Sequence, residues 1–270
     1  MTHKARKRFG QNFLQDGHII RRIIRSISPK PGQHLVEIGP GLGAITEELL
    51  EAVGELDVVE LDRDLIPILR TRFFSYEDKF RIHEGDALKF DFNSLLESEQ
   101  SPQQLRVVGN LPYNISTPLI FHLLAHTGII KDMHFMLQKE VVQRLAAQPG
   151  ENNYGRLGIM AQYYCQVDNL FVVPPEAFDP RPKVDSAIVR LSPYAELPHP
   201  ARDTKDFASI VRISFGQRRK TLRNNLKKTL PTEQIEALEI DPGIRPERLS
   251  LSDFVKLADA YTGFKQDNPS

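Results

Sequence analysis

Glycine and polar residues recur in four short motifs, each of which follows an apolar run typical of a buried strand. The first motif, Glu37 to Ala44, has the sequence EIGPGLGA. Its glycines permit a tight turn and a close backbone approach to a ligand, and the helix expected behind them offers unpaired N–H groups. The spacing from Gly39 onward also fits a G-x-G-x-x-A dinucleotide pattern. Gly39 and Gly41 therefore predict a nucleotide-like cofactor without separating NAD from other candidates.

Acidic residues follow at the ends of the next two expected strands. Glu60 stands 21 residues after Gly39, where a carboxylate can accept hydrogen bonds from both ribose hydroxyls. Asp86 ends the third strand and could accept a hydrogen bond from an adenine amino group, although Asp at such a place also serves as a helix N-cap. Because the carboxyl ends of parallel strands share one edge of a sheet, these residues predict a cofactor laid across that edge.

The motif Asn110 to Tyr113, with the sequence NLPY, ends the fourth expected strand. The exocyclic nitrogen of adenine is a poor nucleophile, because its lone pair is delocalised into the ring. The Asn110 side-chain oxygen and the Leu111 carbonyl, aimed at its two hydrogens, would draw this nitrogen toward tetrahedral geometry and point its lone pair at a methyl donor. Tyr113 offers a face on which a base can stack, worth roughly 1–3 kcal/mol. The alternative is an Asn-Pro turn with a core tyrosine.

Alternating elements are expected to position these motifs. Strands are predicted at residues 34–38, 55–61, 80–83, 105–108 and 134–137, and helices at 46–53, 65–73, 93–97 and 118–126. This alternation predicts an α/β fold with a parallel sheet and helices on both faces. Helices at 140–148 and 157–164 precede two more candidate strands, 170–173 and 187–191, which are expected to close the sheet as a hairpin edge.

The chain ends differ from this central region. An amphipathic helix is predicted over residues 16–27, and a Pro-rich stretch at 192–200 is typical of a linker. Beyond it only helices are expected, at 205–214, 218–230, 233–238 and 252–260, the last with Ser252 as its N-cap. We therefore predict a basic N-terminal segment and helix at 1–30, a catalytic domain at 31–195 and a helical domain at 204–270.

The formal net charge is zero, with 35 basic and 35 acidic residues, but the charges are segregated. Residues 1–30 hold eight bases and one acid, residues 31–100 hold sixteen acids and six bases, and residues 207–228 hold seven bases and no acid. A solvated face would explain either basic cluster alone. Two clusters that flank an acidic centre favour a polyanion partner, bound by neutralisation of its phosphates.

Other classes of protein are disfavoured. Cys165 has no second cysteine to pair with, which suits a reducing cytosol, and no apolar stretch of a secretory signal follows the basic start. The longest uncharged stretch, residues 107–130, contains Asn, Pro and His, so no membrane span is expected. We expect a cytoplasmic protein without a metal site.

With these motifs placed, the sequence resembles the ribosomal RNA adenine dimethyltransferase family, and within it the bacterial small-subunit enzymes. The resemblance covers nearly the whole chain. It includes RKRFGQNFL from Arg6, the four motifs above, PPEAF from Pro174, PRPKVDS from Pro180 and FGQRRKTLRNNL from Phe215.

The resemblance implies a Rossmann-like class I methyltransferase domain and S-adenosylmethionine as methyl donor. Its substrate would be two adjacent adenosines in the 3′-terminal hairpin loop of 16S rRNA, dimethylated at N6 within an assembling small ribosomal subunit by a monomeric enzyme. By resemblance, Asn12, Leu14, Gly39, Glu60, Asp86 and Asn110 bind the cofactor, and Phe178 stacks on the flipped adenine opposite Tyr113. The RNA-binding residues would be Arg6, Lys7, Arg8, Arg218, Arg219, Lys220 and Arg223.

Three alternatives remain open at this point. A nucleotide-dependent oxidoreductase would share the glycine loop and Glu60, but it would leave the Asn110 motif and the basic segments unexplained. A non-catalytic ribosome assembly factor would keep the pocket without needing Asn110 and Tyr113. A large-subunit rRNA adenine methyltransferase would share most motifs and would differ in its target.

Overall fold

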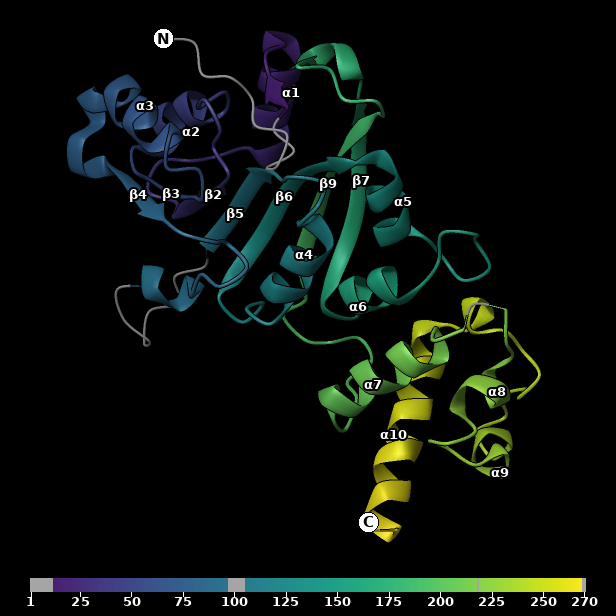
Figure 1. The fold of residues 1–270 in the computed structure, drawn as a ribbon. Helices are drawn as coiled ribbons and strands as arrows, with labels where there is room; N and C mark the ends of the chain where they lie inside the picture. The colour runs from purple at the N-terminus through teal and green to yellow at the C-terminus, as the bar shows by residue number, and fades with distance from the viewer. Residues whose placement is uncertain (1–11, 97–104, 218, 269–270) are drawn as a thin grey trace. The chain divides into compact units, whose positions relative to one another are not determined.

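The computed structural model describes residues 12–96, 105–217 and 219–268 of the chain. Contacts divide the chain into two compact units. The first unit comprises residues 1–142 and 167–193, and the second comprises residues 143–166 and 194–270. Figure 1 shows the elements of both units with their labels.

A seven-stranded sheet forms the centre of the first unit. Its strands lie in the order β4, β3, β2, β5, β6, β9, β7. They span β2 (Leu35–Ile38), β3 (Leu56–Glu60), β4 (Phe80–Glu84), β5 (Leu105–Asn110), β6 (Ile130–Gln138), β7 (Cys165–Val173) and β9 (Ser186–Pro193). The strands from β4 to β6 run parallel, and β9 runs antiparallel to β6. The predicted mostly parallel seven-stranded sheet, with β7 and β9 at one edge, is thus confirmed.

Helices precede, connect and follow the parallel strands. Their bounds are α1 (Gly17–Ile27), α2 (Thr46–Val53), α3 (Leu65–Arg72), α4 (Ser116–Leu124) and α5 (Lys139–Ala146), with short 3₁₀ turns η2 (Phe74–Lys79), η3 (Phe92–Leu95) and η4 (Pro175–Ala177). The apolar sides of α1, α2 and α3 join the strands in one core cluster that includes Ile23, Leu49, Leu69 and Val108. The helix predicted at 93–97 is only the single turn η3.

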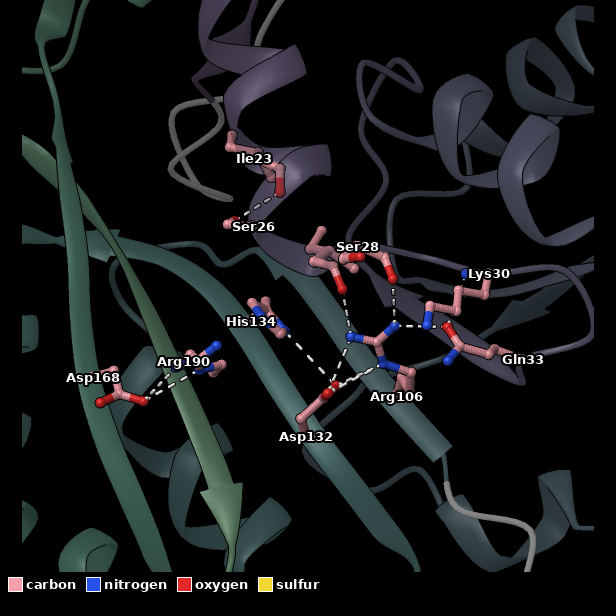
Figure 2. Close-up of polar contacts among 11 residues, drawn as sticks. Ile23, Ser26, Ser28, Lys30, Gln33, Arg106, Asp132, His134, Asp168 and Arg190 are labelled. Atoms are coloured by element: carbon pink, nitrogen blue, oxygen red, sulfur yellow. Dashed lines mark hydrogen bonds and ion pairs between the residues drawn. The ribbon is translucent and has the colours of Figure 1, made fainter.

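Helix α1 is fixed to the sheet at its C-terminal end by a buried arginine (Figure 2). Arg106, on β5, donates through Nη2 to the carbonyl of Ile27 at 2.6 Å, which is a carbonyl that the helix end leaves unpaired. The same guanidinium pairs with both carboxylate oxygens of Asp132 on β6, at 2.9 and 3.0 Å. At the other end, Asp16 caps α1 by accepting hydrogen bonds from the N–H groups of His18 and Ile19.

The residues before α1 form a small second sheet. Strand β1 (Phe13–Leu14) pairs antiparallel with β8 (Phe178–Asp179), so that Leu14 lies opposite Phe178. The Gln15 N–H also donates to the Ala177 carbonyl at 2.8 Å. This pairing brings the start of the described chain onto the segment that follows β7.

The second unit is helical. It contains α6 (Arg156–Tyr164), α7 (Thr204–Ser214), α8 (Leu222–Leu226), α9 (Thr232–Glu236), the turn η5 (Pro246–Arg248) and α10 (Leu251–Asp267). Tyr163 on α6 stacks on Phe207 of α7, with ring centroids 4.1 Å apart. Because α6 packs on α7 and α10, residues 143–166 belong to this unit, although the domain predicted at 31–195 included them.

Two predicted boundaries in this unit are wrong. The N-cap of the last helix is Ser250 and not Ser252, because Ser250 and Asp253 form a reciprocal capping box. The helix predicted at 218–230 shortens to α8, since the Asn225 side chain bonds the carbonyls of Gln217 and Lys220 and competes with helical backbone bonding.

Candidate active site

A cavity of about 500 Å³ opens at the carboxyl ends of the parallel strands in the first unit. Its walls come from the glycine loop after β2, the ends of β3, β4 and β5, and the segment before α1. The sequence-predicted residues that line it are Asn12, Leu14, Gly39, Gly41, Glu60, Asp86, Asn110, Leu111 and Tyr113. The structure therefore brings together all the predicted cofactor residues at the edge where open α/β sheets bind ligands.

The glycine loop follows the cavity wall in a backbone conformation that favours glycine. Gly39 and Gly41 have φ values of +66° and +60°. A Cβ atom at Gly41 would lie 3.3 Å from the Phe13 ring. The loop and the N-terminal segment thus approach each other closely, and a side chain at Gly41 would crowd this contact.

Glu37 lies behind the loop, with only 1% of its surface exposed. Its Oε2 accepts a hydrogen bond from the Thr46 hydroxyl at 2.7 Å. Burial raises the pKa of Glu37 to about 8; the Thr46 bond opposes this rise and nearby Glu60 adds to it. In the protein alone, Glu37 is therefore mostly protonated at neutral pH.

Glu60 and Asp86 are held by backbone N–H groups. Glu60 Oε1 accepts from the Asp62 N–H at 2.7 Å, and Asp86 Oδ1 accepts from the Leu88 N–H at 3.0 Å. Burial raises the pKa of Glu60, while backbone N–H donors from Asp62 and Gly41 lower it. Asp86 thus lines the cavity and stabilises a turn, but the helix N-cap considered for it is wrong, because residues 87–89 form only a turn and the next helical turn, η3, is capped by Asp91.

Asn110 ends β5 at the cavity wall. Its side-chain Nδ2 donates to the backbone carbonyl of Asn12 at 3.2 Å. This bond fixes which end of the amide faces the N-terminal segment, and it leaves Oδ1 as an acceptor on the other side. The role of Asn12 in orienting Asn110 has no signal in local spacing, because the two residues lie at opposite ends of the cofactor region of the sequence.

Leu111 and Tyr113 follow on the loop between β5 and α4. The Leu111 N–H donates to the Met136 carbonyl at 3.2 Å, which ties the loop to β6. The Tyr113 hydroxyl lies 2.9 Å from the hydroxyl of Ser186, the first residue of β9. Ser186 is a residue that the sequence analysis did not identify.

Phe178 is placed differently from the other predicted residues. It is not among the residues that line the cavity. Phe178 as a residue is 4% exposed and belongs to the core cluster, next to the pairing of β8 with β1. Its stacking on a flipped base stays a prediction, and in this arrangement the ring would have to become exposed to act in that way.

The predicted RNA-binding residues divide into two groups. Arg6, Lys7, Arg8 and Arg218 lie outside the described residues. Arg219, Lys220 and Arg223 are exposed in the second unit, within or just before α8, as are Lys227 and Lys228 just after it and Arg212 on α7. The basic cluster of the tail is thus accessible to a ligand in every member that the structure describes.

The prediction of no metal site passed over one histidine pair. His122 and His126 lie four residues apart on and just after α4, a spacing that can hold a metal. In the structure, His122 Nε2 and His126 Nδ1 are within hydrogen-bond distance of the carbonyls of Phe90 and His122. Within residues 12–96, 105–217 and 219–268, no group of three His, Cys, Asp or Glu side chains is arranged to hold a metal ion. In the same part of the chain, no helix is long and apolar enough to cross a membrane.

Comparisons with known proteins agree with this geometry. The family model described as ribosomal RNA adenine dimethylase matches residues 2–262. Ribosomal RNA small subunit methyltransferase A of Marinobacter nauticus is 64% identical over 257 residues, covering 95% of this chain and 91% of its own. The protein of the same name from Pseudomonas aeruginosa is 64% identical over 256 residues, covering 95% of this chain and 94% of its own.

Solved structures give the same picture. A dimethyladenosine transferase from Plasmodium falciparum is 28% identical with a TM-score of 0.75, covering 91% of this chain and 95% of its own. A 23S rRNA methyltransferase, ErmE, shares the fold at 24% identity with a TM-score of 0.71, covering 93% of this chain and 100% of its own. The resemblance found in the sequence is confirmed: the chain belongs to the ribosomal RNA adenine dimethylase family.

Proposed function

We propose that this protein transfers methyl groups from S-adenosylmethionine to N6 of two adjacent adenosines in the 3′-terminal hairpin loop of 16S rRNA. The observation that carries the proposal is Asn110, held by Asn12 at the wall of the cavity with Leu111 and Tyr113 beside it. The substrate would be an assembling small ribosomal subunit, which is the subunit named in the curated relatives.

The cavity fits S-adenosylmethionine in size and chemistry. Its volume of about 500 Å³ lies within the range of cofactor pockets. Glu60 and Asp86 would hold the ribose and the adenine through acceptor oxygens, and the glycine loop would pass close under the methionine portion. When bound, this group supplies an electrophilic methyl on a sulfonium. Asn12 and Leu14 would close the cavity from the N-terminal side, where they line it now.

Two acceptors of this chain would prepare the target nitrogen. The Asn110 Oδ1 atom and the Leu111 carbonyl would accept hydrogen bonds from the two hydrogens of the adenine amine. The nitrogen would then move toward tetrahedral geometry, with its lone pair free to attack. As the N–C bond forms, the C–S bond would break and leave its electron pair on the sulfur, and the methylated, cationic nitrogen would then lose a proton to solvent. Asn110 is well suited to this part, because the Asn12 carbonyl already takes its Nδ2 group. The protein would then accelerate the reaction mainly by positioning the methyl donor and the target nitrogen, which contributes much of the rate enhancement in two-substrate reactions.

The exposed bases around α8 would bind rRNA phosphates. Arg219, Lys220 and Arg223 lie within four residues of one another along the chain, and all three are exposed. Such contacts release counterions and make binding salt-dependent. We place the protein in the cytoplasm as a monomer, a state that sedimentation of the pure protein would test.

Labelled methyl transfer tests the proposal. Small subunits from cells that lack the activity should accept label from S-adenosylmethionine at the two adjacent adenosines. Asn110→Ala should abolish the transfer while cofactor binding, measured by calorimetry, is largely kept. Label that appears only on the large subunit would overturn the substrate, and full activity of Asn110→Ala would overturn the mechanism.

A further inference from the structure

Ser186 joins two parts of the site that are distant in sequence. It is the first residue of β9, and no part of its surface is exposed. Its hydroxyl lies 2.9 Å from the hydroxyl of Tyr113. A buried hydroxyl needs a hydrogen-bond partner to offset its loss of contact with water. For Ser186 the partner is the hydroxyl of Tyr113, a half-buried residue at the cavity wall.

The backbone of Ser186 is held on a rigid support. Ser186 pairs with Gln138 across the antiparallel β6–β9 ladder. Lys139, which follows β6 and begins α5, donates its N–H to the Asp185 carbonyl at 3.0 Å, and its Nζ lies 3.3 Å from Asp185 Oδ2. The Ser186 hydroxyl therefore projects from a fixed point of the central sheet.

Tyr113 lies on a loop and has fewer constraints of its own. Its carbonyl accepts a hydrogen bond from the Ser116 hydroxyl at 3.2 Å, which fixes the backbone at one point. The ring extends from this point, and the bond to Ser186 holds its far end. With both ends held, the long axis of the ring keeps one direction at the cavity wall.

We propose that Ser186 is a positioning residue that holds the Tyr113 ring in place at the cavity wall, through their hydroxyl–hydroxyl bond, so that the ring is available to the flat face of the target base. The inference rests on the proposed function, because it requires that the base stacks on Tyr113. Ser186 does not touch the base and acts through Tyr113 alone. Loss of its hydroxyl should therefore lower the rate of methyl transfer to the RNA and leave cofactor binding unchanged.

A double-mutant cycle tests this coupling. Ser186→Ala and Tyr113→Phe each remove one hydroxyl of the pair and keep the rest of the side chain. Each variant should lower kcat/KM for unmethylated small subunits about three- to tenfold, the range that one hydrogen bond contributes. The double variant should be no worse than either single variant, since both remove the same bond. The cofactor Kd, measured by calorimetry, should stay unchanged in all three.

Ser214→Ala is the matched control. Ser214 is also fully buried, on α7, and its hydroxyl has no hydrogen-bond partner among the described residues. This variant should keep the wild-type rate, which shows that removing a buried serine hydroxyl is not itself harmful. Thermal unfolding of every variant shows whether a loss of rate results from a loss of folded protein. Tyr113→Phe removes the same hydrogen bond at a half-buried residue, so it tests the bond without a change in a fully buried residue.

Tyr113→Ala separates the two proposals. If Tyr113→Ala is inactive while Ser186→Ala and Tyr113→Phe keep the wild-type rate, the positioning role is wrong and the stacking role stands. If Tyr113→Ala keeps full activity, stacking itself is wrong and the positioning role is wrong with it. Losses that add in the double variant, or a weaker cofactor Kd in Ser186→Ala, would also overturn the inference, because they would show that Ser186 acts independently of Tyr113.

Discussion

Replacement of Arg106 should destabilise the first unit strongly. The side chain is 6% exposed, and it pairs with Asp132, whose side chain is 15% exposed. Arg106→Met keeps most of the volume but leaves the Asp132 carboxylate buried without its cation, which costs about 3–5 kcal/mol. It also removes the donor to the Ile27 carbonyl at the end of α1, worth about 1 kcal/mol more. A total of about 4–6 kcal/mol lowers Tm by roughly 10–20 °C for a unit of this size.

Arg190→Met is the matched control, since Arg190 lies in the same region of the sheet (Figure 2). Arg190 pairs with Asp168, but the two side chains are 40% and 28% exposed. Solvent screens such a pair, and its loss should cost less than about 1 kcal/mol. Circular dichroism during heating, at equal protein concentration, compares the two variants with the wild type.

Two further results would check the reasoning about Arg106. Asp132→Asn in the Arg106→Met background should recover part of the lost stability, because it removes the unpaired charge. His134 should also respond: its pKa is lowered to about 4, because burial outweighs the opposing effect of Asp132, 3.7 Å away, and the nearby Arg106 adds to the lowering. A lowered folded-state pKa makes the wild type gain stability as pH rises from about 4 toward the ordinary value of 6.5. Without Arg106 the folded-state pKa of His134 should rise toward that ordinary value, so the variant should gain less stability over the same pH window. Equal Tm values for Arg106→Met and Arg190→Met would refute the argument.

Three other changes have defined outcomes. Gly109→Ala should lower both Tm and methyl transfer, because its Cβ would lie 2.5 Å from the Ile38 carbonyl on the neighbouring strand, and a wild-type Tm would contradict this. The stability of Glu37→Gln relative to the wild type should increase as pH rises from about 4.5 to about 8. The folded-state pKa of Glu37 is raised, so the wild type loses stability across this window and the variant does not. Parallel Tm–pH curves for the two proteins would refute this. Neutral replacements of Arg219, Lys220 and Arg223 should weaken binding to the small subunit and reduce the slope of log Kd against log salt concentration by up to about 0.7–0.9 per lost phosphate contact. An unchanged slope would show that these side chains only face solvent.

The sequence predicts what depends on neighbours along the chain. The glycine loop, Glu60, Asp86 and Asn110 each stand at the end of an apolar run, and one rule places all of them at the same sheet edge. The parallel direction of the strands follows from the alternation of strands and helices, whereas their order in the sheet comes from the structure alone. Even the capping box at Ser250 and Asp253 has a local signal, which the prediction of Ser252 missed.

Long-range pairing decides the features that the sequence does not predict. Phe178 is buried because β8 pairs with the segment that contains Leu14, and no spacing within either segment indicates this. The bond between Tyr113 and Ser186 likewise depends on where β9 enters the sheet. Helix α6 joins the second unit because Tyr163 stacks on Phe207, a contact across the Pro-rich stretch.

The formal charges counted from the sequence also differ from the charges that the side chains carry or expose in the folded protein. The acidic balance of residues 31–100 suggests a strongly negative site for a cation, but formal charges overstate it. Although burial raises the pKa of Asp57, hydrogen bonds from His34, His83 and Arg81 lower it well below its usual range, so this charge is neutralised within the sheet. Glu37 is mostly protonated at neutral pH, because burial dominates its pKa. A bound cation would favour the ionised form of Glu37, so the full negative charge of the cavity would develop only with the cation in place and with release of a proton.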